Sequence, residues 1–212
     1  MDKNLEAAKA IALARRNHAP LADLERPPAD EAEGYQIQRA LHDLLLPHVG
    51  PLVGYKIGCT SQVMQDYIGI PHPCSGGVFQ KGVHDSGAKL AASKYVRVGV
   101  ECEIAGRLKR DLAAGCVLGP SVPRSSVPDL KAVKGRAILN GEEVSHGTGA
   151  DVLGHPHNAL AWLANHLAAE GKGLHAGQLV LTGSLVKTLW LKAGDKVRME
   201  LEGLGAVEAE FR

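Results

Sequence analysis

Apolar residues recur with helical spacing in residues 1–50 and in short strand-like runs after them. Over residues 3–17 and about 29–47, apolar side chains three and four positions apart would form one face of a helix. Between these segments, Arg26-Pro27-Pro28 requires extended chain, because proline disfavours the helical conformation in the residue before it. The pattern predicts two helices at the start of the chain.

From Pro51 onward, short apolar runs are interrupted by glycine, which is typical of strands and turns. Residues 52–58 (LVGYKIG) predict a strand, and residues 61–69 (SQVMQDYIG) predict a short helix that begins at Thr60 or Ser61. A hairpin is expected over residues 136–147, with its turn at Asn140-Gly141.

The clearest helix is expected over residues 155–169 (HPHNALAWLANHLAA), where Pro156 suits the first turn and Gly171 can end the helix. Strand-like runs follow it to the end of the chain, with turns at residues 193–195 and 203–205. We therefore expect an α+β protein with a helical N-terminal segment at residues 1–50 and a β-rich body at residues 51–212. A chain of 212 residues with 45% hydrophobic content is expected to form one compact domain overall.

Two acidic residues stand out in residues 96–108 (VRVGVECEIAGRL), which predict one strand with alternating apolar positions. Glu101 and Glu103 would then share a face about 7 Å apart, a spacing that allows both carboxylates to bind one hard cation. The alternative is that Arg97, Glu101 and Glu103 only cover a solvated sheet face. A metal-dependent enzyme is the leading hypothesis.

Lys56 lies between Gly54 and Gly58 on one face of its predicted strand, and the glycines would leave space for a ligand. An ammonium group there can hold a carboxylate or stabilise an enolate, whereas the ordinary alternative is a solvated lysine. The residues Thr182-Gly183-Ser184 end another apolar run and can donate hydrogen bonds to a carboxylate, or form a plain turn.

Composition narrows the class of protein. The formal charge of +1 gives no surface suited to nucleic acid phosphates, so a small-molecule partner is expected. The four cysteines include no Cys-x-x-Cys pair, which favours reduced thiols in a cytosol, and the histidines lack zinc-ligand spacing. Neither a signal peptide nor a membrane-spanning stretch is found, and nucleotide-binding glycine motifs are absent. A soluble cytoplasmic protein is expected.

Four segments together resemble the 2-hydroxypenta-2,4-dienoate hydratase and 4-oxalocrotonate decarboxylase family of the fumarylacetoacetate hydrolase superfamily. The similarity extends over nearly the whole chain, in the expected order. Its strongest parts are Gly-x-Lys-Ile-Gly, Glu-x-Glu, Gly-His-Pro with Trp-Leu-Ala, and Leu-Thr-Gly. The four segments are residues 54–70, 100–112, 147–167 and 176–211.

The resemblance implies a cytoplasmic Mg²⁺ or Mn²⁺ enzyme that adds water to a small 2-hydroxy-dienoate (2-oxo-4-pentenoate-like) acid in aromatic catabolism. Decarboxylation of a 2-oxo acid or carbon–carbon hydrolysis on the same scaffold is the alternative. It also implies a mixed, bent β-sandwich or roll, a homo-oligomer and a possible complex with other pathway enzymes. Glu101 and Glu103 match the metal ligands, Lys56 matches the active-site lysine, and Thr182, Gly183 and Ser184 match the substrate-carboxylate loop.

At two places the sequence departs from the family pattern, which affects the residue roles that the resemblance implies. The third acidic metal ligand expected after the Glu-x-Glu strand is missing, so either a segment near residues 108–116 is absent or Asp85, Asp111 or Glu142 substitutes for it. A third hypothesis is therefore a non-catalytic subunit with a degraded metal site.

The second departure is an aspartate proposed for proton transfer in several hydratases, which would align near Cys74. His72 or Cys74 is expected to take its proton-transfer role, since either group can act as an acid or base when its pKa is suited.

Overall fold

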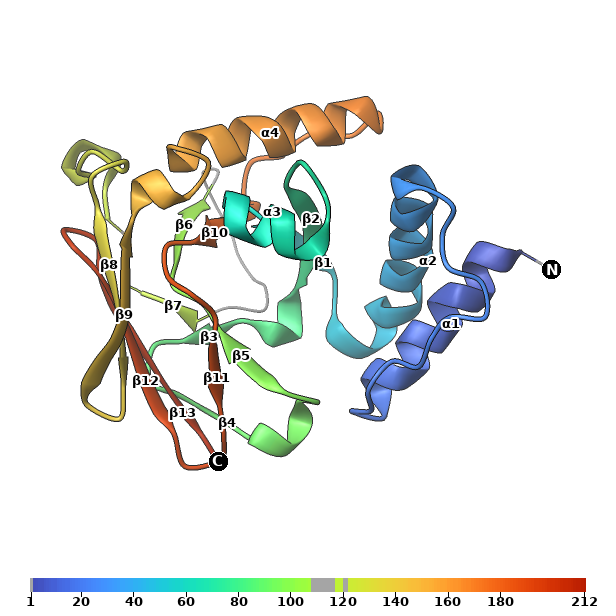
Figure 1. Cartoon of the computed structure of the whole chain (residues 1–212), viewed down its shortest axis with the longest axis horizontal. Coiled ribbons are helices and arrows are strands. Elements are labelled where there is room, and N and C mark those ends of the chain that lie inside the picture. Colours follow the sequence, from blue (N-terminus) through green and yellow to red (C-terminus); the bar gives the residue numbers. More distant parts are fainter. Residues whose placement is uncertain (1, 108–116, 120–121) are drawn as a thin grey trace.

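The computed structural model describes residues 2–107, 117–119 and 122–212, and it has the expected α+β class. Figure 1 shows a five-stranded sheet at the left, helix α4 across the top and a pair of helices at the right. Within the described residues, no helix is long and apolar enough to cross a bilayer. The α-helices are α1 (Lys3–Arg16), α2 (Glu31–Val49), α3 (Gln62–Ile68) and α4 (Pro156–Ala169).

Helices α1 and α2 lie side by side at one side of the molecule and run in roughly the same direction, because the segment between them returns to the level at which α1 begins (Figure 1). Both begin at an aspartate cap: Asp2 accepts a hydrogen bond from Asn4 N at 3.0 Å, and Asp30 accepts one from Glu33 N at 2.8 Å. The pair encloses an apolar cluster of its own, separate from the core of the β-rich body, and both predicted helices are confirmed. The buried residues of this cluster are Ala8, Ala12, Ile37, Leu41 and Leu45.

The β-rich body contains two main sheets and two short ribbons. A four-stranded sheet has the order β2-β1-β10-β6, with β1 and β10 parallel. Its strands are β1 (Leu52–Gly58), β2 (Cys74–Phe79), β6 (Glu103–Arg107) and β10 (Leu179–Ser184). A five-stranded sheet is made of β4 (Ala88–Leu90), β13 (Gly205–Phe211), β12 (Lys196–Leu201), β8 (Lys134–Leu139) and β9 (Glu142–Thr148), in that order.

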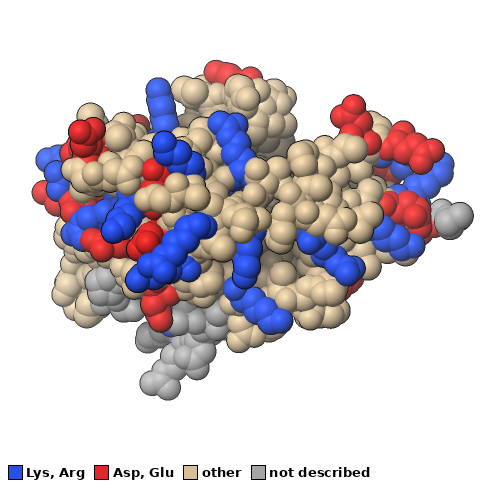
Figure 2. All heavy atoms as spheres, turned by 90° about the horizontal axis from the view of Figure 1, so that it is seen from below, with Lys and Arg blue, Asp and Glu red and all other residues tan. Residues whose placement is uncertain are grey.

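The ribbons pair β11 (Leu189–Leu191) with β5 (Val98–Val100) and β3 (His84–Asp85) with β7 (Val117–Leu118). Single turns of 3₁₀-helix lie at Gln80–Gly82, Ala92–Lys94, Arg124–Ser126 and Gly149–Asp151. On the side of the five-stranded sheet, Lys and Arg side chains are mixed with Asp and Glu over the surface (Figure 2).

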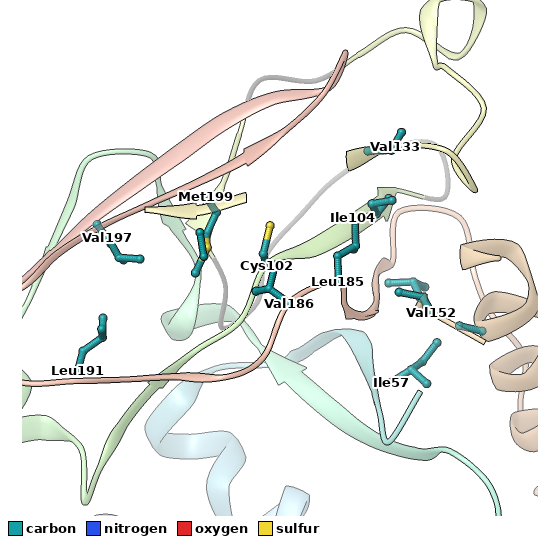
Figure 3. Packing of buried hydrophobic residues seen from close by; sticks show 14 of the residues in the cluster. Ile57, Cys102, Ile104, Val133, Val152, Leu185, Val186, Leu191, Val197 and Met199 are labelled. Atoms are coloured by element: carbon teal, nitrogen blue, oxygen red, sulfur yellow. The ribbon is translucent and has the colours of Figure 1, made fainter. Parts of the chain in front are cut away.

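The main core lies between the two sheets and below α4. Figure 3 shows residues from both sheets converging there, including Ile104 from β6 and Met199 from β12. Helix α4 buries Ala159, Leu163 and Leu167 against this core. Burial of this apolar stripe gives the helix most of its stability, because an isolated helix of 14 residues is marginal in water.

Most predicted elements of the body are confirmed. Ser61 caps α3, the β8–β9 hairpin turns at Asn140-Gly141, and Pro156 is the first residue of α4. The turns at residues 193–195 and 203–205 join β11 to β12 and β12 to β13.

The prediction of one strand over residues 96–108 is wrong. The segment contains two strands, β5 and β6, which belong to different sheets and are separated by Glu101 and Cys102. The reason is that residues 98–107 and residues 179–191 pass together from one sheet to the next. Strand β6 pairs with β10 in the four-stranded sheet, and β5 pairs with β11 in a separate ribbon. We call the place where both segments change sheet the crossing. Hydrogen bonds between Cys102 and the segment Ser184–Leu185 join the crossing.

Truncation of Leu163 tests the α4 interface. Its side chain is fully buried, so Leu163→Ala should lower the free energy of unfolding by about 2–5 kcal/mol, through lost burial and the cavity that remains. The matched control is Leu13→Ala on α1, where the side chain is 58% exposed and the loss should stay below about 1 kcal/mol. Urea unfolding followed by circular dichroism measures both, and equal losses would contradict this packing.

Candidate functional site

The carboxylate of Glu103 lies where the four-stranded sheet meets the crossing. Glu103 is the first residue of β6 and pairs with Ser184 of β10. Its Oε2 accepts a hydrogen bond from Gly183 N at 2.6 Å. Burial raises the pKa of this carboxyl group to about 7; the Lys56 ammonium acts in the opposite direction, and the negative charge of Glu101 adds to the increase. A cation bound beside Glu103 would favour its ionised form.

Glu101 lies in the two-residue break between β5 and β6 and is exposed. Its Oε1 accepts a hydrogen bond from the Thr188 hydroxyl at 2.7 Å, across the crossing. Each glutamate thus has one carboxylate oxygen fixed by a donor. Among the described residues, the other oxygen of each glutamate has no hydrogen-bond donor, and is available to a ligand.

Lys56 extends from the centre of β1, and its stem lies over Gly76 of the neighbouring strand β2. Lys56, Glu101, Glu103 and Thr182 line one cavity, whose other walls are largely apolar. The interpretation of Gly54 needs correction, since a Cβ there would lie 2.2 Å from the carbonyl oxygen of Leu179. Gly54 therefore permits the close approach of β10 and does not leave space for a ligand.

The expected loop or turn at Thr182–Ser184 is not found: these residues are the last three of strand β10, and their donors are used within the protein. The Thr182 hydroxyl donates to Ile104 O at 2.9 Å, and the Ser184 hydroxyl donates to Val186 O at 2.7 Å. Gly183 has φ of 110°, and a Cβ at this position would lie 2.3 Å from Oγ1 of Thr60. Only glycine fits, and its backbone N–H is thereby aimed at Glu103.

The two candidate proton-transfer residues lie apart from the cavity wall. His72 pairs with Glu31, at 3.3 Å from Nε2 to the carboxylate, and its Nδ1 lies 2.9 Å from the carbonyl oxygen of Pro73. Cys74 lies at the start of β2 near Lys56, and burial raises the pKa of its thiol to about 11. Cys74 is thus the nearer of the two to Lys56, and its thiol is neutral at pH 7.

No third acid joins the glutamate pair within the part of the chain that the structure describes. Asp85 lies in β3 and Glu142 at the tip of the β8–β9 hairpin, and neither belongs to a group of three or more residues suited to a metal. Asp111 lies outside the described residues. The pair still fits Mg²⁺, which is commonly bound by one or two carboxylates, several waters and oxygens of the substrate.

Sequence reasoning missed Thr188, Gly183 as the donor to Glu103, and Thr60, which packs against Gly183. Thr188 and Glu101 are 87 positions apart in the sequence. A single hydroxyl residue at the start of a strand carries no signal of such a contact, so only the tertiary structure reveals it.

Comparison of the sequence with known proteins shows the family to which this chain belongs. Residues 99–212 match the profile of the fumarylacetoacetate (FAA) hydrolase C-terminal domain. A protein of Burkholderia vietnamiensis (strain G4 / LMG 22486) named 2-keto-4-pentenoate hydratase is 31% identical over 240 residues, which cover 92% of this chain and 91% of that protein. The chain belongs to the fumarylacetoacetate hydrolase superfamily.

Another relative in the superfamily, named 4-oxalocrotonate decarboxylase, from Pseudomonas putida, is 26% identical over 265 residues and is covered in full. A solved structure, 4-oxalocrotonate decarboxylase from Pseudomonas putida G7 complexed with magnesium and adipate, has a TM-score of 0.91 at 24% identity. It covers 100% of this chain and 98% of that one. This likeness shows that the two proteins share the fold.

The alignment lengths also reveal a difference from the relatives. An alignment of 265 positions that includes all 212 residues of this chain leaves at least 53 positions of the decarboxylase without a counterpart. This relative therefore carries a sizeable amount of sequence that this chain lacks.

The raised pKa of Glu103 predicts how the stability of the metal-free protein depends on pH. The carboxyl group titrates near pH 7 when folded, against an ordinary value of 4.5, so the folded state binds its proton more tightly. Its stabilising contribution is full below about pH 4.5 and is lost as pH rises through 7. Glu103→Gln should remove this loss and stabilise the protein at pH 8 by about 1–3 kcal/mol, but not at pH 4.5.

Thermal unfolding in a chelator, compared across this pH range, measures the difference. Glu142→Gln at the exposed hairpin tip is the control and should show no such pH dependence. An equal stabilisation by Glu103→Gln at both pH values would show that Glu103 is not buried as described.

Proposed function

We propose that this protein is a divalent-metal-dependent hydro-lyase that adds water to a small 2-hydroxy-dienoate acid of the 2-oxo-4-pentenoate type. The observation that carries the proposal is a 31% identity over more than nine tenths of the chain to a protein named 2-keto-4-pentenoate hydratase. Further support comes from a protein of Comamonas testosteroni named 2-hydroxyhexa-2,4-dienoate hydratase, which is 30% identical over 92% of the chain. Both names describe hydration of a short unsaturated acid.

Glu101 and Glu103 are the residues that would hold Mg²⁺ or Mn²⁺ in this proposal. When bound, such an ion supplies positive charge that attracts the carboxylate of the acid and withdraws electrons from its C2 oxygen. Thr188 and Gly183 hold one oxygen of each glutamate, so the free oxygens need little rearrangement on binding. The preorganised carboxylates are the main contribution of the protein to the metal site.

Lys56 supplies the second positive group. Its ammonium lies close enough to lower the pKa of Glu103, and it lines the same cavity. A substrate carboxylate or a developing enolate oxygen would gain a charge-assisted hydrogen bond from Nζ, and Nζ can deliver a proton there. The largely apolar walls of the cavity leave these charged groups few other polar partners, which favours their interaction with a charged ligand.

Proton transfer at the far end of the acid needs a further group, and we assign it to Cys74 ahead of His72. Cys74 lies near Lys56 and keeps its proton at neutral pH, whereas His72 is paired with Glu31. Thr182, Gly183 and Ser184, at the end of β10, are retained as the segment beside the substrate carboxylate. Because their donors are used within the protein, this segment would act mainly by positioning Glu103.

Decarboxylation of a 2-oxo acid is the second candidate, with carbon–carbon hydrolysis as a related reaction on the scaffold. It is favoured by the protein named 4-oxalocrotonate decarboxylase, whose alignment includes the whole chain at 26% identity. The same charged groups would stabilise the enolate left by departing CO₂. Product analysis separates these reactions, since hydration adds water and decarboxylation releases CO₂.

A non-catalytic subunit with a degraded metal site is the third candidate. It is favoured by the 53 or more positions without a counterpart and by the absence of a third acid near the glutamates in the described residues. In each case we propose a cytoplasmic homo-oligomer that is able to associate with enzymes of the same pathway. Residues 1–50 would form its helical segment and residues 51–212 its β-rich body, which is catalytic in the first two candidates, with a small acid as the ligand.

Activity is tested by incubating the purified protein with Mg²⁺ and 2-hydroxypenta-2,4-dienoate and following the absorbance of the dienol. The wild-type protein should consume the dienol, and Glu101→Gln should reduce the rate by at least about 100-fold, because one metal carboxylate is lost. Glu202→Gln, on an exposed turn, is the matched control and should retain the wild-type rate. A wild-type rate no faster than Glu101→Gln would count against hydratase activity.

Metal binding is tested separately by titration calorimetry with Mn²⁺. One site is expected, Glu103→Ala should abolish it, and Thr188→Val should weaken it by about 10-fold because Glu101 loses its orienting hydroxyl. Thr188→Ser keeps a hydroxyl and should bind as the wild type does. Absence of a site in the wild-type protein would favour the non-catalytic subunit.

A further inference from the structure

Two cysteine thiols are in contact beside Lys56, in a part of the structure that the proposed metal site does not use. Cys59 follows β1 and Cys74 begins β2, and the Cys74 thiol donates to Sγ of Cys59 over 3.7 Å. The S–S bond of a disulfide is about 2.0 Å long, so the two sulfurs would have to approach by about 1.7 Å, which rotation of the side chains can supply. The fold therefore already brings these two sulfurs close to bonding distance.

The backbone around the pair holds the sulfurs together. Cys59 has φ of 56°, a left-handed conformation that residues other than glycine rarely adopt. Its carbonyl oxygen accepts a hydrogen bond from Nε2 of the buried Gln65 at 2.9 Å, which fixes this conformation. Gly58 leaves space for the second sulfur, because a Cβ there would lie 3.3 Å from Sγ of Cys74.

We propose that Cys59 and Cys74 form a reversible oxidation site, which a hydroperoxide converts to a disulfide. Cys74 is partly exposed whereas Cys59 is buried, so the oxidant meets Cys74 first. With hydrogen peroxide, the O–O bond breaks, one oxygen is transferred to the Cys74 sulfur to give a sulfenic acid, and the other oxygen leaves as water. The Cys59 sulfur then attacks Sγ of Cys74, the S–S bond forms and a second water leaves, so two thiols give up two electrons to one peroxide.

The surroundings of Cys74 set the conditions under which this oxidation occurs. Burial raises the pKa of its thiol to about 11, so only a small fraction is thiolate at neutral pH and dilute peroxide reacts slowly. A sulfenic acid once formed is already in contact with its resolving partner, which favours the disulfide over further oxidation. The product removes the neutral thiol beside Lys56, and this inference does not depend on the reaction proposed for the site.

The experiment uses the reduced full-length protein, treated with millimolar hydrogen peroxide and then with an alkylating reagent. No Lys or Arg separates the two cysteines, so both fall in the tryptic peptide 57–81. After oxidation this peptide should be about 2 Da lighter and carry no alkyl group, and dithiothreitol should restore two alkylatable thiols. Cys102 lies in the separate peptide 98–107 and is the internal control, which should stay fully alkylatable.

Cys74→Ser and Cys59→Ser should each prevent the loss of mass, and the second variant covers the case in which the first fails to fold. The proposal would be overturned if peptide 57–81 stayed reduced while Cys102 was oxidised. Conversion of Cys74 to a sulfinic acid without a disulfide, or a crosslink between two chains, would equally overturn it.

Discussion

The hydrogen bond from Gly183 N to the half-buried carboxylate of Glu103 fixes the position of the site in the fold. A buried carboxylate needs a donor, because its desolvation is costly, and here the donor comes from the opposite strand of the crossing. Gly183 can supply its N–H only in a left-handed conformation that leaves no room for a Cβ against Thr60. Sheet geometry, a glycine and the acid–base properties of Glu103 are thus coupled at one point.

The crossing of the two segments explains how two acids so near in sequence have different surroundings. Strand β6 continues the four-stranded sheet and partly buries Glu103, whereas Glu101 lies in the break that precedes it and remains exposed. Thr188, in the partner segment, crosses at the same level and reaches Glu101. A divalent cation would be held between one enclosed and one accessible carboxylate, which suits a site that must also admit a substrate.

Cys74 connects the proposed site with the dithiol. In the resemblance that the sequence shows, an aspartate is expected near this position. A thiol with a raised pKa is a weaker acid than a carboxyl group, but it retains its proton at neutral pH, where an ordinary aspartate is ionised. The same side chain contacts Cys59, so proton donation and oxidation compete for one sulfur atom. Lys56 faces both the carboxylate pair and this thiol, which makes β1 the strand on which the two features meet.

Local patterns in the sequence determined the helices, the hairpin, most strands, and the glutamate pair with Lys56 as candidate ligands, because periodicity and turn residues act over a few neighbouring positions. They failed at residues 96–108, where alternation looked continuous although the chain passes from one sheet to another between Val100 and Glu103. Only the tertiary structure decided that break, the donors to the two carboxylates and the contact of Cys59 with Cys74. Each of these contacts depends on segments brought together by sheet pairing. The identity of a single residue does not indicate which distant residue it will contact.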